Sequence, residues 1–109
     1  MKAAVWLEKD VIAIKDIPKP GIKPNEVLLR VKAAGVCMTD IHRLKGVIKI
    51  GEPPQVMGHE IAGEIIELGN DVHNWNTADR VVVETNIGCG DCYYCRRGMK
   101  HLCINGGEI

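Results

Sequence analysis

The chain has 109 residues, which is enough for one domain with its own core and too few for two domains of usual size. Its 14 Lys and Arg residues balance 14 Asp and Glu residues, so no net charge would attract nucleic acid or an anionic membrane. The apolar N-terminus is too short for a signal peptide, and no stretch is long enough to span a bilayer. We therefore expect a soluble, cytoplasmic protein without nucleic acid or membrane partners.

The predicted strands are short and are separated by turns. In the segment 27–32, Val27, Leu29 and Val31 occupy alternate positions, which is typical of a strand with one buried face. Similar β-rich segments lie at residues 3–7, 11–14, 61–68 and 80–84. Pro and Gly residues between these segments predict turns. Short strands at such spacing indicate a mostly β fold, as a largely antiparallel barrel or sandwich.

One short helix is expected between residues 39 and 46. The Thr39 hydroxyl or the Asp40 carboxylate could cap the free N–H groups at its start, and Gly46 ends it. Such a helix would have about two turns. The last residues, Gly106 to Ile109, contain neither a stop signal nor a capping element, so we expect the chain to end inside a larger protein.

Four of the five cysteines lie close together near the C-terminus. Cys89, Cys92, Cys95 and Cys103 have the spacing C-x2-C-x2-C-x7-C. Four thiolates from one loop would fill the tetrahedral shell of a zinc ion and leave no position for a substrate, so such a site is structural. We expect a zinc-binding lobe over residues 88–104, in which glycines let the loop wrap around the ion.

Other interpretations of this four-cysteine lobe stay open. Two disulfides or four unrelated thiols would also account for the cysteines, although disulfides are rare in a reducing compartment. An iron–sulfur cluster is a third interpretation. The bacterial ferredoxin pattern has three residues before its last cysteine and a proline after it, whereas this chain has seven residues there and Ile104 follows. The spacing favours zinc.

A second group of metal-binding residue types lies earlier in the chain. It consists of Cys37, Thr39, Asp40, His42, His59 and Glu60. Each residue alone means little, because a cysteine is often a small buried apolar residue and a histidine often lies on the surface. Together, a thiolate and an imidazole on separate segments suit an open catalytic zinc site, which needs a third protein ligand and a water. Nearby carboxylates could orient the imidazole.

Both groups of residues belong to one ordered series of motifs. The series is Gly35-Val36-Cys37, Thr39-Asp40 with His42, Gly58-His59-Glu60, Asp79-Arg80-Val81 and the four-cysteine lobe. In this order and spacing the motifs resemble the zinc-dependent medium-chain alcohol dehydrogenases, and the match covers essentially the whole chain. The resemblance implies a GroES-like catalytic domain over residues 1–109, a partly open β barrel with a short helix and a zinc-stapled loop.

The resemblance also implies roles for individual residues. Cys37 and His59 would be ligands of the catalytic zinc, and Glu60 would be an alternate ligand. Asp40 would orient His59, and the lobe cysteines would hold a structural zinc. In this family the third catalytic ligand and the Rossmann domain, which binds NAD or NADP, lie beyond residue 109. No G-x-G-x-x-G motif follows a strand in this chain.

The implied reaction is the oxidation of an alcohol to an aldehyde or ketone by hydride transfer to NAD or NADP, with zinc as a Lewis acid. Thr39 would take the alcohol proton and pass it to His42, because histidine exchanges protons near neutral pH. Thr39 could equally be a helix cap, and His42 could be a plain surface residue. The chain alone is expected to be inactive, because it lacks a cofactor-binding unit.

Two other classes of protein share these features in part. A noncatalytic zinc-stapled GroES-like module would use the fold as a binding surface, and a quinone-reductase-like relative would keep the fold without zinc. Cys37, His59 and the four lobe cysteines argue against the relative without zinc, and the complete catalytic group favours the dehydrogenase. The identity of the small-molecule alcohol or carbonyl substrate, the choice between NAD and NADP, and the formation of a homo-oligomer stay open.

Overall fold

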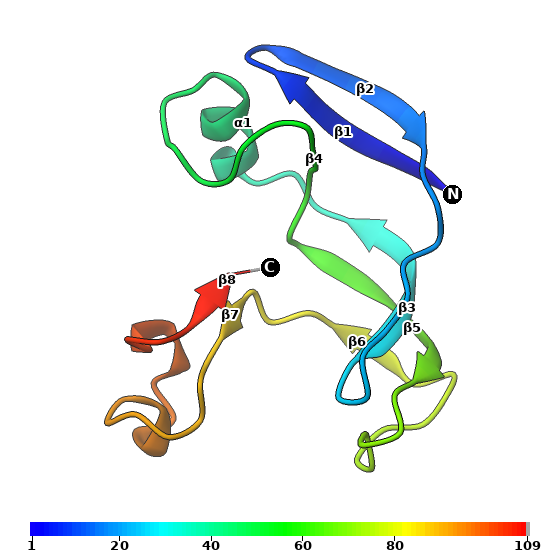
Figure 1. The fold of residues 1–109 in the computed structure, drawn as a ribbon, viewed down its shortest axis with the longest axis vertical. Coiled ribbons are helices and arrows are strands. Elements are labelled where there is room, and N and C mark those ends of the chain that lie inside the picture. Colours follow the sequence, from blue (N-terminus) through cyan, green and yellow to red (C-terminus); the bar gives the residue numbers. More distant parts are fainter. Residues whose placement is uncertain (109) are drawn as a thin grey trace.

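The computed structural model describes residues 1–108, and the final residue of the expected domain, Ile109, lies outside the described residues. Residues 1–108 form a mostly β structure with one short α-helix, as the sequence predicts (Figure 1). The strands are β1 (Lys2–Glu8), β2 (Val11–Asp16), β3 (Val27–Ala34), β4 (Gln55–Val56), β5 (Ile61–Leu68), β6 (Arg80–Val82), β7 (Asn86–Ile87) and β8 (Gly107–Glu108). The helices are α1 (Met38–Leu44) and the 3-10 helices η1 (Cys95–Arg97) and η2 (Lys100–Leu102).

Three antiparallel sheets organise these strands. β1 is the central strand of the sheet β2-β1-β4, and β5 is the central strand of the sheet β3-β5-β6. β7 and β8 form a two-stranded sheet at the base of the lobe. The core draws on both larger sheets, because Val5 and Trp6 from β1, Leu28 from β3 and Ile65 from β5 are buried. This open arrangement of sheets agrees with the expected GroES-like, partly open barrel.

The pairing of β3 with β5 sets the geometry of the candidate site. The two strands run antiparallel, and their register ends at Ala34 opposite Ile61. Register shifts along the pair increase the bend of the strands, as β-bulges do. Gly63 allows the close approach, because a Cβ atom there would lie 2.8 Å from the Arg30 carbonyl oxygen. The end of β3 and the start of β5 therefore lie side by side.

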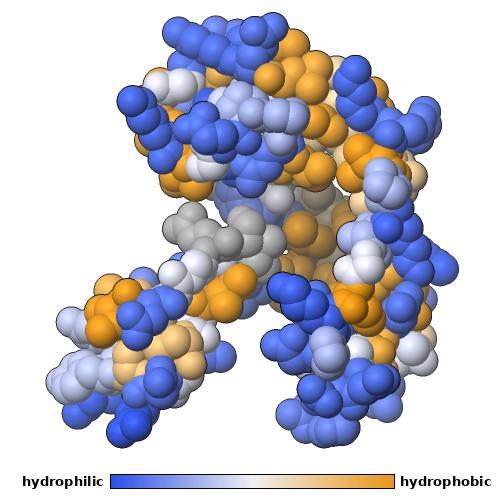
Figure 2. Space-filling model, viewed as in Figure 1, coloured by the Kyte–Doolittle hydropathy of each residue, from blue (hydrophilic) through white to orange (hydrophobic). Residues whose placement is uncertain are grey.

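The described residues form an open arc (Figure 1). Their radius of gyration is 15.5 Å, whereas a compact domain of this length would have about 13 Å. Apolar side chains of both edge strands in the second sheet are exposed, with Val31 at 54% and Val82 at 82%. Figure 2 shows apolar surface in the concave middle of the molecule. The fold therefore leaves part of its apolar surface uncovered.

The strand predictions are confirmed with shifted ends. The segment 61–68 has the predicted bounds, and the first three strands extend by one or two residues at an end. β6 is shorter than the predicted 80–84 and ends at Val82. Beyond it, the Glu84 side chain forms hydrogen bonds with Asn86, which compete with a continued ladder. The sequence does not predict β4, β7 and β8, because each strand has only two residues and so shows no periodic pattern.

The helix begins one residue earlier than expected. Cys37 occupies the N-cap of α1, and Thr39 lies inside the helix, so the Thr39 cap is wrong. The Asp40 carboxylate accepts the Cys37 N–H (3.0 Å) and stabilises the helix start. Gly46 follows the helix with a φ of 68°, the left-handed conformation that glycine tolerates. Within residues 1–108, no helix is long and apolar enough to cross a membrane.

Candidate metal centres

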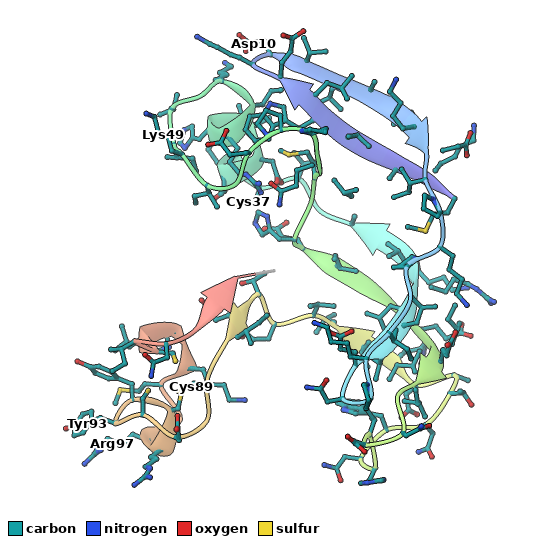
Figure 3. The ribbon with its side chains drawn as sticks, in the orientation of Figure 1. Asp10, Cys37, Lys49, Cys89, Tyr93 and Arg97 are labelled. Atoms are coloured by element: carbon teal, nitrogen blue, oxygen red, sulfur yellow. The ribbon has the colours of Figure 1, made fainter. Side chains whose placement is uncertain are left out.

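The first candidate centre joins side chains from two segments of the chain. Cys37 immediately precedes α1, while His59 and Glu60 immediately precede β5. One ligand atom from each of these three residues lies within 4.8 Å of the others. Figure 3 shows Cys37 beside the start of α1. The fold thus brings together the three residues that the sequence singles out for the catalytic metal.

Sheet pairing explains why these segments meet. Cys37 follows β3 and Glu60 precedes β5, and the antiparallel register places these two strand ends together. The backbone continues this pairing beyond the strands, because the Gly35 N–H donates to the Glu60 carbonyl (2.7 Å). The register of one strand pair therefore determines the distance between a thiol and an imidazole that are remote in sequence.

Asp40 connects the two halves of the first centre. The residue is only 7% exposed. Oδ2 accepts the Cys37 N–H (3.0 Å), and Oδ1 lies 3.4 Å from Nδ1 of His59. Oδ1 is buried and accepts no hydrogen bond within residues 1–108, although an unpaired buried charge is costly. The arrangement leaves Nε2 of His59 free for a ligand when Nδ1 faces Asp40.

The Cys37 thiol and the His59 imidazole influence each other. Hydrogen bonding from the Thr39 backbone is the largest influence that lowers the pKa of the Cys37 thiol, followed by the Thr39 hydroxyl and His59. The hydrogen bond with Cys37 is the largest influence that raises the pKa of His59, and nearby carboxylates raise it further. The thiolate, which is the form that ligates a metal, is therefore easier to form at Cys37 than in a free cysteine.

A hollow of about 520 Å³ opens beside the first centre. Its lining includes Ala33, His59, Glu60, Ala62, Val82 and Thr85. Glu84 also lines it, and the Asn86 backbone N–H and side-chain amide both donate to its Oε1 atom (3.0 and 2.7 Å). These bonds, the backbone one first, lower the pKa of the Glu84 carboxyl. Sequence analysis missed Glu84 and Thr85, because no motif marks them and only sheet pairing brings them here.

The two residues expected to move protons differ in position. Thr39 is half-buried, and its Oγ1 atom lies 3.6 Å from the Cys37 Sγ atom. His42 is exposed and does not belong to the cluster of ligand atoms found among the described residues. Thr39 is thus placed beside the first centre, whereas the proton path to His42 stays a prediction.

The second candidate centre is the four-cysteine lobe. One sulfur from each of Cys89, Cys92, Cys95 and Cys103 lies within 4.8 Å of the others. All four are free thiols. The Sγ atoms of Cys92 and Cys103 are 3.9 Å apart, whereas a disulfide would require about 2 Å. The lobe therefore presents four sulfur ligands around one point, as its spacing predicts.

Local backbone geometry builds this second centre. A Cβ atom at Gly88 would lie 2.9 Å from the Cys95 Sγ atom, so glycine leaves the space for that sulfur. The Cys95 N–H donates to the Cys92 Sγ atom (3.4 Å), and this bond is the largest influence that lowers the pKa of Cys92 to about 6. Hydrogen bonding with the Asp91 side chain raises the pKa of Cys89 to about 12. The backbone thus prepares at least one thiolate.

Figure 3 places the two centres in different parts of the arc, with Cys37 beside α1 and Cys89 in the lobe. Tyr93 and Arg97 lie at the far end of the lobe in the same view. The Arg97 guanidinium stacks 3.6 Å from the centroid of the Tyr93 ring and donates to its carbonyl (3.2 Å). This cation–π contact joins two exposed side chains within the lobe.

Sequence comparison relates the chain to known proteins. The profile of the alcohol dehydrogenase GroES-like domain matches residues 23–108. The L-threonine 3-dehydrogenase of Pyrococcus horikoshii is 47% identical over 100 residues, which cover 83% of this chain and 26% of that protein. The D-altritol 5-dehydrogenase of Agrobacterium fabrum is 40% identical over 103 residues, which cover 94% of this chain and 31% of that protein. The chain spans about a third or less of the length of these curated relatives.

Solved structures show the same architecture. The alcohol dehydrogenase TADH from Thermus sp. ATN1 superposes with a TM-score of 0.89 at 37% identity, over 99% of this chain and 31% of that chain. A zinc-binding dehydrogenase from Sinorhizobium meliloti, solved with NADP bound, superposes with a TM-score of 0.86 at 33% identity, over 99% of this chain and 31% of that chain. Both likenesses extend through the two candidate centres.

Proposed function

We propose that this chain is the catalytic domain of a zinc-dependent alcohol dehydrogenase. The chain belongs to the alcohol dehydrogenase GroES-like domain family. Such an enzyme oxidises an alcohol to an aldehyde or ketone by hydride transfer to NAD or NADP. The observation that carries this proposal is the convergence of Cys37, His59 and Glu60, with their ligand atoms within 4.8 Å. The domain alone would not turn over, because the hydride acceptor needs its own binding unit.

The donor atoms of the first centre fit a catalytic zinc. A sulfur, an imidazole nitrogen and a carboxylate oxygen are all ligand types that zinc accepts. Three protein ligands would leave the fourth tetrahedral position for a water or a substrate oxygen. The second centre fits a structural zinc instead, because four thiolates complete the shell. We therefore assign Cys37, His59 and Glu60 to catalysis and the lobe cysteines to structure.

The mechanism assigns a task to each residue around the first centre. When bound, zinc would supply a Lewis acid that lowers the pKa of the alcohol. Asp40 would hold His59 in one tautomer through Nδ1. The Thr39 hydroxyl, beside Cys37, would accept the alcohol proton and pass it toward His42 at the surface. The hollow would hold the reacting carbon, with Ala62 and Val82 providing its apolar wall.

The substrate proposed here is a small alcohol with at least one further polar group. The relatives named above act, by their names, on threonine and altritol, which both carry such groups. Glu84 and Thr85 place polar atoms in the hollow next to Glu60. Asn86 occupies one oxygen of Glu84, so the other can accept a hydrogen bond from a substrate hydroxyl or amino group.

A domain exchange tests this function. In a hybrid protein, this chain would replace the matching N-terminal segment of the Pyrococcus horikoshii L-threonine 3-dehydrogenase. The hybrid would keep the remainder of that enzyme. We expect zinc-dependent oxidation of small polyols or hydroxy amino acids, measured as reduction of NAD or NADP. Cys37→Ser in the hybrid should abolish the activity, whereas the matched control Lys15→Gln, on the exposed strand β2, should retain it.

Two results would contradict the proposal. One is a hybrid that binds two zinc ions and the cofactor but oxidises no alcohol in the panel. That result would favour a zinc-stapled binding module. The other is nicotinamide-dependent turnover by the chain alone, with contamination excluded.

A further inference from the structure

Gly35 lies against the first candidate centre in an unusual way. It is placed between the end of β3 and Cys37, and its N–H pairs with the Glu60 carbonyl. A Cβ atom at this position would overlap Oε2 of Glu60, and it would lie 3.0 Å from the Glu60 Cβ and 3.2 Å from its carboxyl carbon. Contacts this short would force the Glu60 side chain to move. The space that a side chain would need at Gly35 is therefore occupied by the carboxylate of a candidate ligand.

Backbone conformation does not explain this glycine. Gly35 lies outside the left-handed region of φ, so an alanine could adopt its backbone angles. Gly58, next to His59, is the opposite case. Its φ is 101°, and a Cβ atom there would meet no atom within 4 Å. Gly58 thus provides a turn, whereas Gly35 provides room.

Room is important because little else holds the Glu60 carboxylate. The residue is exposed, and none of the hydrogen bonds or ion pairs found within residues 1–108 involves its side-chain oxygens. The Oδ1 atom of Asp40 faces Nδ1 of His59 (3.4 Å), and the Sγ atom of Cys37 lies 3.6 Å from the Thr39 hydroxyl oxygen. Glu60 has no comparable support. Its approach to the other two ligands therefore depends on what surrounds it, and Gly35 lies directly against it at the end of β3.

We propose that Gly35 is a positioning residue for the metal centre: the absence of its side chain lets the Glu60 carboxylate reach a metal held by Cys37 and His59. This inference rests on the proposed catalytic metal centre. It makes Gly35 the determinant of whether this domain offers two ligands or three. Gly35→Ala should turn Glu60 away from the metal and leave Cys37 and His59 in place.

A metal titration of the chain tests this inference without any enzyme assay. The lobe is first filled with one equivalent of Zn²⁺, and Co²⁺ is then added as a visible probe of the weaker site. Wild type should bind Co²⁺ with sulfur-to-metal absorption. Gly35→Ala should bind it about 10 to 100 times more weakly, the range expected when support for a ligand is lost. Gly21→Ala is the matched control, because a Cβ atom there meets no atom within 4 Å.

A second pair of variants makes the test independent of folding problems. Glu60→Ala removes the carboxylate, so the Gly35→Ala/Glu60→Ala double variant keeps only the 3.0 Å contact between the two Cβ positions. A shift of a few tenths of an ångström relieves that contact, so both variants should fold. Their Co²⁺ affinities should agree within about threefold, because Gly35 acts only through Glu60. A double variant that binds much more weakly than Glu60→Ala would overturn the inference. The inference about Gly35 would also be overturned if wild type and folded Gly35→Ala had the same Co²⁺ affinity and spectrum. That result would not contradict the proposed metal centre. Failure of wild type to bind any Co²⁺ would overturn the proposed metal centre itself.

Discussion

The two candidate metal centres have similar dimensions and different origins. Ligand atoms lie within 4.8 Å of one another in both. In the lobe, all four sulfurs come from residues 89–103, and local turns and glycines place them. In the first centre, Cys37 and His59 meet only because β3 pairs with β5. Metal-ligating atoms can therefore be brought together by a short loop or by the pairing of two strands.

This difference predicts how each centre responds to perturbation. A loop that carries its complete ligand set gains most of its order from the metal. A centre built on sheet register requires the folded sheet before any metal can bind. The lobe should thus lose its structure with its metal, and the first centre should lose its metal with its sheet.

The largest expected effect is at the lobe. Cys92→Ser should remove the firmly held zinc, because three thiolates and a hydroxyl no longer form the complete shell. Structural zinc contributes on the order of 10 kcal/mol to small zinc-organised folds, so residues 88–104 should lose protection from hydrogen exchange. The two larger sheets should stay protected. Full zinc content in Cys92→Ser would contradict a structural zinc site in the lobe.

The second prediction separates the centres by occupancy. Mild chelation should leave close to one zinc per chain, because four protein ligands hold the ion more tightly than three. His59→Ala should abolish the weaker binding and leave the lobe zinc unchanged. Elemental analysis before and after chelation measures both quantities. Retention of two zinc ions per chain would show that the first centre is as complete as the lobe.

A substitution in the core of the second sheet should weaken metal binding at the first centre and leave the zinc of the lobe in place. Ile65 on β5 is 1% exposed, so Ile65→Ala should lower the free energy of unfolding by about 2 to 5 kcal/mol. In urea, this variant should lose Co²⁺ binding at Cys37 earlier than wild type does, while the lobe keeps its zinc. Val82→Ala is the control, because its side chain is 82% exposed and the change should stay within about 0.5 kcal/mol. If Ile65→Ala lost Co²⁺ and the lobe zinc at the same urea concentration, the two centres would not be independent.

The smallest expected effect concerns a turn remote from both centres. The Lys23 N–H donates to the Glu26 carboxylate (2.9 Å), and this bond is the largest influence that lowers the pKa of Glu26. The carboxylate therefore stabilises the fold above the ordinary pKa of about 4.3, and this contribution is lost as the pH falls through the folded-state pKa. Glu26→Gln should lower Tm slightly at pH 7 and leave it unchanged at a pH below the folded-state pKa, with the same metal content as wild type at each pH. An equal loss of Tm at both pH values would contradict this charge-dependent role.

Sequence analysis succeeded where the determining residues are neighbours. The alternation in 27–32 and the β-rich segment 61–68 predict two strands that the structure contains. The spacing of the lobe cysteines predicts a cluster that the structure also contains. The expected cap at Thr39 is wrong, because Cys37 is the N-cap residue. The alternative cap, the Asp40 carboxylate, is confirmed, because it accepts the Cys37 N–H. Composition and spacing do not locate the first residue of a helix to within one position.

What the sequence by itself determined about this protein is its longer strands, its local lobe and the residue types of its first metal centre. Only the tertiary structure decided that Glu84 and Thr85 share a hollow with His59. It also decided that Gly35 lies against the Glu60 carboxylate. The physical reason is the range over which each arrangement is set. Spacing along the chain limits how far a loop can reach, whereas contacts between strands depend on a register that long-range pairing alone establishes.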